Sequence, residues 1–160
     1  MKFSTKEDID APIEQVFGIV TDFEAYERAI MRRGAELQRV DTLAQPGQGM
    51  KWQSRFSYRG RPRELAAELT QYLPHEAITL TSQSQGLNGV FKVDLVALSP
   101  RHTRMAVTLE MKPNSITARL FLQSLRLAKS NLTRRFKKSV RNFARDVEAR
   151  LGTDSAVGLH

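Results

Sequence analysis

The chain has 160 residues, no cysteine and a formal net charge of +8. This length suits one domain with a core of its own, and the lack of cysteine excludes disulfides and thiolate chemistry. No apolar run approaches the roughly 20 residues that span a bilayer, and the N-terminus lacks the apolar core of a signal peptide, so we expect a soluble, cytoplasmic protein.

The first thirty residues predict a strand followed by two short helices. Residues 2–10 predict a short polar strand, with Phe3, Thr5 and Ile9 as its expected anchors. Asp10 is the expected N-cap of the first helix, and Pro12 suits its first turn. Asp22 is the expected N-cap of the second helix. Apolar residues at helical spacing give the first helix one apolar face: Ile13, Val16, Phe17 and Val20.

Between Gly34 and Lys112 the apolar residues recur with a period of two, which predicts strands. Turn residues separate the segments, so consecutive strands are expected to form an antiparallel meander. The six predicted strands are 35–43, 50–60, 62–73, 77–84, 89–98 and 104–112.

The last segment, from Ser115 to Leu151, predicts one long helix or two helices in line. Gly152 is the expected helix end, and residues 153–160 are expected to form a loose tail after a single domain of residues 1–152. The sheet needs a large apolar partner, and the terminal helix is the only one the sequence offers. We therefore predict an α+β fold in which a curved antiparallel sheet of about seven strands wraps around the C-terminal helix.

The stretch APIEQVFGIVTDFEAYE, with six strands and a long terminal helix after it, resembles the START-like superfamily. This group includes polyketide cyclases and dehydrases and the birch-pollen allergens. The resemblance implies a helix-grip fold with an apolar cavity between the sheet and the C-terminal helix. Members that bind ubiquinone-like lipids usually have Pro after the Tyr, whereas Glu27 follows Tyr26 here. The residues that carry the resemblance are Ala11, Pro12, Val16, Phe17, Val20, Asp22, Phe23 and Tyr26.

Strand alternation indicates which side chains face the helix and are therefore able to line such a cavity. The same side chains would also form an ordinary core, and the sequence does not separate the two interpretations. The candidate cavity residues are Met50, Trp52, Ser54, Phe56, Tyr58, Leu69, Leu80, Ser82, Phe91, Leu95, Met105, Leu109, Met111, Phe121 and Leu125.

The terminal segment carries the whole basic excess. Residues 115–151 contain ten Lys or Arg and two acids, and the rest of the chain contains fifteen of each sign. On a continuous helix, an apolar stripe within about 60–80° of Leu132 faces the sheet, with Phe121, Leu125, Phe136, Val140 and Phe143 on it, and the basic residues lie on the opposite face. We expect this basic face to be solvated: Arg134, Lys137, Lys138, Arg141 and Arg145.

The beginning of the same segment is apolar on nearly all sides. Leu120 and Leu127 fall on the side that later becomes basic. We therefore expect Ile116–Leu127 to cover the cavity mouth or to form a homodimer contact. The basic face allows an anionic membrane surface or an acidic partner, and its lack of aromatic residues argues against nucleic acid.

The leading functional hypothesis is the binding or transport of a small hydrophobic ligand such as a lipid, polyketide or isoprenoid. The alternatives are a cyclase or dehydratase acting on an aromatic or polyketide substrate, and a basic-helix adaptor. No catalytic residue is assigned, because His75 and His102 lie in turns and the chain has no metal-ligand spacing. No cofactor and no metal are predicted.

Overall fold

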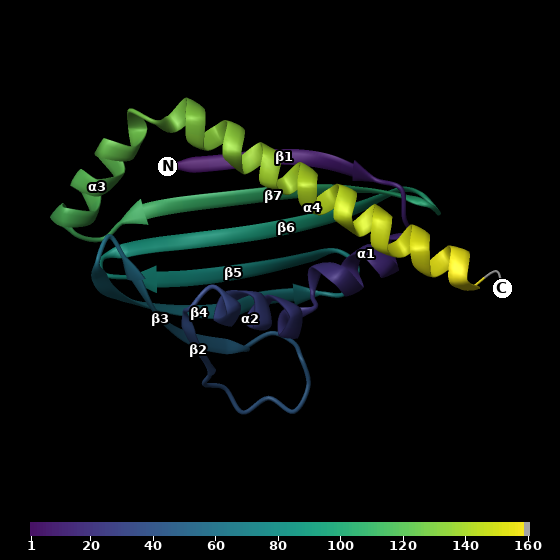
Figure 1. Ribbon diagram of the computed structural model, residues 1–160, viewed down its shortest axis with the longest axis horizontal. Helices are drawn as coiled ribbons and strands as arrows, with labels where there is room; N and C mark the ends of the chain where they lie inside the picture. Colours follow the sequence, from purple (N-terminus) through teal and green to yellow (C-terminus); the bar gives the residue numbers. More distant parts are fainter. Residues whose placement is uncertain (159–160) are drawn as a thin grey trace.

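The computed structural model describes the backbone of residues 1–158 and the side chains of residues 1–152. Seven strands form one antiparallel sheet in the order β1-β7-β6-β5-β4-β3-β2 (Figure 1). From β2 to β7 every strand pairs with its neighbour in sequence, and β1 joins the far edge beside β7. The strands are β1 Lys2–Ile9, β2 Glu36–Arg39, β3 Lys51–Tyr58, β4 Arg61–Leu73, β5 Ala77–Ser84, β6 Leu87–Ser99 and β7 His102–Pro113. The helices are α1 Ile13–Val20, α2 Phe23–Arg32, α3 Ile116–Arg126 and α4 Lys129–Gly158.

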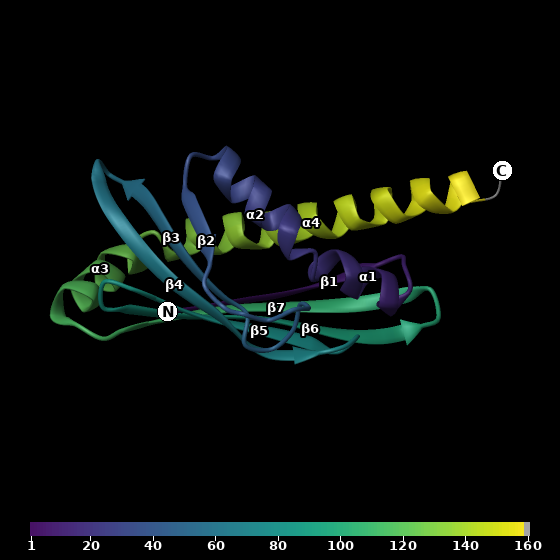
Figure 2. The ribbon, with the colours of Figure 1, turned by 90° about the horizontal axis from the view of Figure 1, so that it is seen from below.

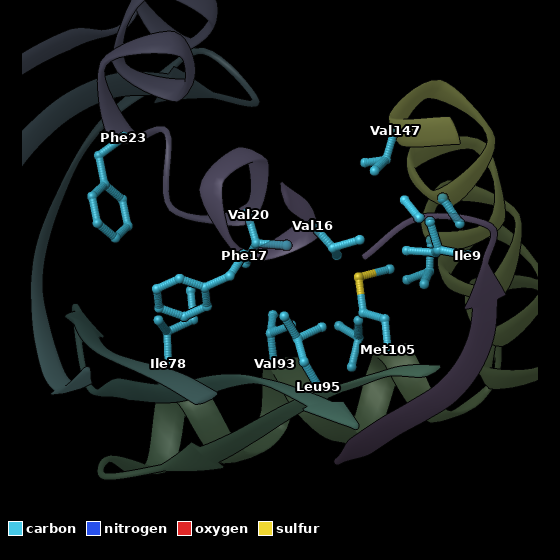
Figure 3. Close-up of a cluster of buried hydrophobic side chains, with 14 of the residues drawn as sticks. Ile9, Val16, Phe17, Val20, Phe23, Ile78, Val93, Leu95, Met105 and Val147 are labelled. Atoms are coloured by element: carbon cyan, nitrogen blue, oxygen red, sulfur yellow. The ribbon is translucent and has the colours of Figure 1, made fainter. Parts of the chain in front are cut away.

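The helices α1, α2 and α4 all lie on the same side of the sheet (Figure 2). Buried apolar side chains from α1, the strands and α4 form one core cluster beneath them, in which Val16, Met105 and Val147 are almost fully buried (Figure 3). This arrangement confirms the predicted helix-grip fold. No helix in the described part of the chain is long and apolar enough to cross a membrane.

The two short helices begin differently from each other. Asp22 caps α2 as predicted, because its carboxylate accepts a hydrogen bond from the Ala25 amide at 3.3 Å. The prediction for α1 is wrong: its N-cap is Pro12, without a side-chain cap, and Asp10 instead pairs with His102 at 3.2 Å. Pro12 tolerates this position because it has no amide proton to satisfy.

Alternation along the strands is interrupted in β4 by a register shift between Leu69 and Gln71. One extra residue moves the following side chains to the opposite face of the sheet. Tyr72 therefore points toward α1, where its ring centroid lies 5.4 Å from that of Phe17. A strict period of two would have placed Tyr72 on the outer face.

The two C-terminal helices are not in line. α3 and α4 meet in a bend at Leu127–Ala128 (Figure 1). Neither proline nor glycine lies at this bend, so packing rather than a helix breaker accounts for it. Ala118 and Leu122 of α3 are buried, and α3 contacts β7, whereas α4 lies along β1.

Gly152 does not end α4, which continues to Gly158. A glycine inside a helix costs only about 1 kcal/mol relative to alanine, which a long packed helix tolerates. Residues 159–160 of the predicted tail lie outside the described residues.

Candidate ligand cavity

A cavity of about 700 Å³ lies between the inner face of the sheet, α2 and α4. Its lining is almost entirely apolar and comes from every element except β1 and α3. The residues that line it are Val20, Phe23, Tyr26, Glu27, Ile30, Leu37, Trp52, Ser54, Leu65, Ala67, Ile78, Leu80, Phe91, Val93, Met105, Val107, Leu109, Phe136, Ser139, Val140 and Phe143.

The floor of the cavity consists of side chains that lie next to one another across the strands. Leu80 pairs with Phe91, which in turn pairs with Leu109. The adjacent row is built in the same way from Ile78, Val93 and Val107. Since inward positions alternate along each strand, antiparallel pairing places these apolar side chains in continuous rows.

α4 forms the opposite wall. Phe136, Val140 and Phe143 follow one another at spacings of four and three, which places them on one helical face. The ring centroid of Phe136 also lies 5.8 Å from that of Phe3 on β1, so this wall is held against the sheet edge. Ile30 on α2 and Ser139 on α4 line the cavity and are exposed, which indicates that it opens to solvent between these two helices.

Few polar groups reach the cavity, and the hydroxyls of Tyr26 and Ser54 already donate hydrogen bonds to the backbone. The Tyr26 hydroxyl donates to the Ile19 carbonyl at 3.0 Å, and the Ser54 hydroxyl donates to the Glu36 carbonyl at 2.9 Å. Burial, together with the charge of Asp22, raises the pKa of Tyr26 to about 12, so its hydroxyl is neutral at physiological pH. Because both hydroxyl protons are engaged, the remaining lone pairs would accept hydrogen bonds from a ligand.

Trp52 forms the β3 part of the wall. Its ring lies 5.6 Å from the ring of Phe23, and the guanidinium carbon of Arg39 lies 5.8 Å from its centroid. Arg39 is fixed by two hydrogen bonds of 2.6 Å to the Asp41 carboxylate. These bonds and the Lys51 amide hold the pKa of Asp41 well below its usual range. A fixed cation on the neighbouring strand β2 thus supports the Trp52 ring.

The structure brings six of the fifteen predicted residues to the cavity. These are Trp52, Ser54, Leu80, Phe91, Met105 and Leu109. The other nine candidates are outside its lining. Three of them are buried in the core: Met50, Leu69 and Leu95. The remaining six lie on β3, β5, β7 or α3, outside the cavity: Phe56, Tyr58, Ser82, Met111, Phe121 and Leu125.

The predicted set left out two groups of helical lining residues, and also the strand residues Leu37, Leu65, Ala67, Ile78, Val93 and Val107. Val20, Phe23, Tyr26 and Ile30 come from α1 and α2, and their helical spacing indicated a buried face without indicating a cavity. Phe136, Val140 and Phe143 were predicted to lie on the sheet-facing stripe of the terminal helix, and α4 does turn this face toward the sheet. Phe121 and Leu125 do not lie on this stripe, because the prediction assumed one continuous helix and the chain bends at Leu127–Ala128.

The five residues of the predicted basic face are all exposed. Two of them contact β1: Arg141 lies 3.5 Å and Arg145 lies 3.8 Å from the Glu7 carboxylate. Arg145 also donates to the Asp8 carbonyl at 2.6 Å and pairs with Glu148 at 2.8 Å. The C-terminal half of this face therefore helps to dock α4, and Arg134, Lys137 and Lys138 have no ion pair within the described residues.

The histidines that the structure describes lie away from the cavity. His102 is held between Asp10 and the Ser99 hydroxyl, and His75 is an exposed turn residue with φ of 63°. No group of three His, Asp or Glu within the described residues is arranged to hold a metal ion.

A family model described as polyketide cyclase / dehydrase and lipid transport matches residues 1–148. The chain belongs to this family. The match confirms the START-like resemblance and includes all elements that line the cavity. A search of curated proteins found no match.

Several solved structures share the fold of this family member. The Zhui aromatase/cyclase from Streptomyces sp. R1128 superimposes with a TM-score of 0.65 at 10% identity, covering 94% of this chain and 95% of that one. A protein from Thermus thermophilus superimposes with a TM-score of 0.64 at 16% identity, covering 94% of this chain and 99% of that one. A START superfamily protein from Mycobacterium smegmatis superimposes with a TM-score of 0.52 at 17% identity, covering 84% of this chain and 95% of that one. At these identities the likeness shows the fold alone.

Proposed function

We propose that the protein binds one small hydrophobic molecule in the cavity and carries or senses it. The cavity itself is the observation that supports this proposal. Its volume of about 700 Å³ falls within the range of roughly 300–1,000 Å³ that small-molecule sites occupy. Aromatic and methionine side chains in its wall suit apolar ligands of variable shape.

The distribution of polar groups favours binding over catalysis. Glu27 is the one carboxylate among the lining residues, and burial raises the pKa of Tyr26 still further above physiological pH. General acid–base chemistry works best with groups that titrate near the operating pH, and usually needs more than one of them. A ligand with an apolar body and a single hydroxyl or amine fits better, since Ser54 and Tyr26 offer acceptor lone pairs.

A cavity-filling substitution tests this proposal directly. Ala67 lies on the inner face of β4, lines the cavity and pairs with Trp52 across the strands. Ala67→Phe places a ring into the ligand space, whereas Ala66→Phe, one residue earlier on the outer face, is the matched control. We expect a neutral environment-sensitive dye to bind wild type and Ala66→Phe equally and to bind Ala67→Phe at least about tenfold more weakly.

The same pair of variants serves to find the natural ligand. The three proteins are purified from cells and compared by native mass spectrometry after exposure to a lipid extract. A bound mass present in wild type and Ala66→Phe but absent from Ala67→Phe would identify a cavity ligand. Equal dye binding by all three proteins would overturn the proposal.

A further inference from the structure

Three large apolar side chains of α3 and its C-cap are exposed, although α3 packs on the fold with its other face. The exposed fractions are 78% for Ile116, 60% for Leu120 and 94% for Leu127. At 100° per residue these three positions fall within about 40° of one another, so they form a single stripe. The buried residues Ala118 and Leu122 lie on the opposite side. The helix therefore has one apolar face for its own fold and a second for something else.

The charge around this stripe is of one sign. Residues 111–145 contain ten Lys or Arg and no Asp or Glu. Arg119 and Arg126 flank the stripe on the same side and are exposed, and Lys129 follows at the start of α4. An apolar stripe whose charged neighbours along the helix are all cations is the pattern of a helix that lies in the interface of an anionic bilayer.

A second element points the same way. The β3–β4 hairpin lies at the same end of the molecule as α3 in both views (Figures 1 and 2). Tyr58, Arg59 and Arg61 at this hairpin are exposed, and the Arg59 guanidinium carbon lies 5.3 Å from the Tyr58 ring centroid. Tyrosine and arginine are residues that favour the boundary between lipid headgroups and water.

We infer that this end of the molecule is a docking surface for anionic membranes, with Ile116, Leu120 and Leu127 in the acyl boundary and Arg119 and Arg126 at the headgroups. A second copy of the chain fits less well, because a symmetric contact would bring the arginines of both copies together. Nucleic acid fits less well too, because its phosphates would leave the apolar stripe without a partner. The docking surface does not depend on what the cavity holds.

Vesicle flotation tests this surface. Wild type is mixed with vesicles of phosphatidylcholine alone, or of phosphatidylcholine with phosphatidylglycerol. We expect it to float with the anionic vesicles, to lose this binding at high salt, and to stay in solution with the neutral ones. Because the side chains are exposed, the variants below are expected to keep the wild-type melting temperature.

Leu120→Ser combined with Leu127→Ser should weaken partition to anionic vesicles by about tenfold or more, since the apolar anchors are lost. Arg119→Gln combined with Arg126→Gln should weaken it by about fivefold for each arginine. The matched control is Val96→Ser with Leu98→Ser, two exposed apolar residues of β6 on the outer face of the sheet, which should bind as wild type does.

Three results would overturn the inference. The first is a leucine variant that floats like wild type. The second is a wild-type dimer in vesicle-free buffer that the leucine substitutions convert to a monomer, which would assign the stripe to a second copy. The third is tighter binding of duplex DNA than of anionic vesicles at the same salt concentration, unchanged by the leucine substitutions.

Discussion

α3 and α4 are consecutive helices built from the same kinds of residue, yet they use their apolar side chains in opposite ways. α4 packs Val140, Ala144 and Val147 into the core and keeps its basic face exposed, with Arg141 and Arg145 paired to β1. α3 buries Ala118 and Leu122 and exposes Leu120 and, at its C-cap, Leu127. The difference shows that the face a helix turns toward the sheet, more than its apolar content, decides which side chains stabilise the fold.

The largest effect is expected from placing a charge on each helix in turn. Val147 of α4 is almost fully buried, so Val147→Asp should lower the free energy of unfolding by at least about 3 kcal/mol, the cost of an unpaired buried charge. Leu127→Asp at the exposed end of α3 should change it by no more than about 0.5 kcal/mol. Urea unfolding measures both. Equal destabilisation would mean that the exposed stripe is packed in solution.

Two phenylalanines sharpen the comparison, because the sequence pattern placed both on one stripe. Phe136 of α4 lines the cavity and contacts Phe3, so Phe136→Ala should cost about 2–3 kcal/mol and weaken dye binding by about tenfold. Phe121 of α3 is half-buried outside the cavity, so Phe121→Ala should cost about 1–2 kcal/mol and leave dye binding unchanged. Loss of dye binding in the Phe121 variant would place α3 over the cavity after all.

The third prediction concerns Tyr26, which lines the cavity from α2. Tyr26→Phe removes the hydrogen bond to the Ile19 carbonyl and should cost about 1 kcal/mol at neutral pH. The pKa of Tyr26 rises on folding from 10.0 to about 12, so the folded state holds this proton more tightly. The stabilisation is complete below pH 10 and is lost as the pH rises toward about 12. Chemical denaturation across this range should show a steeper loss in wild type than in Tyr26→Phe, and identical slopes would contradict the burial of the hydroxyl.

The smallest effects distinguish the two halves of the basic face. Arg145→Gln removes the contacts with Glu7, Asp8 and Glu148 and should cost about 1 kcal/mol or less, because these groups are partly solvated. Lys137→Gln relieves repulsion from Arg141 one turn away and should gain a few tenths of a kcal/mol. Thermal unfolding at low and high salt separates the two, since only the first variant should have lost a salt-sensitive docking contact.

The sequence predicted the order of the elements and the inward faces of the strands, because a period of two is set by the backbone itself. Met105 and Leu109 of β7 were placed correctly by alternation alone. The bulge after Leu69 is one exception, since its extra residue turned Tyr72 inward without any local signal. Gly152 misled the helix boundary because a glycine inside a helix costs only about 1 kcal/mol relative to alanine.

The cavity was harder to predict than the fold. Met50, the residue before β3, and Trp52 on β3 have the same parity, yet Met50 is packed in the core and Trp52 lines the cavity. What separates them is how far along the strand the helices still cover the sheet, which depends on tertiary packing. The bend between α3 and α4 has the same origin, and it moved Phe121 and Leu125 away from the cavity to which a continuous helix would have brought them.

The most direct test of the ligand cavity is to locate a bound molecule by backbone amide NMR. The neutral dye is titrated into the isotope-labelled protein, and the shift of each assigned amide is followed. The cavity account predicts the largest changes at Trp52, Phe91, Leu109 and Phe136, with saturation at one dye for each chain. Changes confined to α3 and the β3–β4 hairpin, or changes that do not saturate, would contradict it.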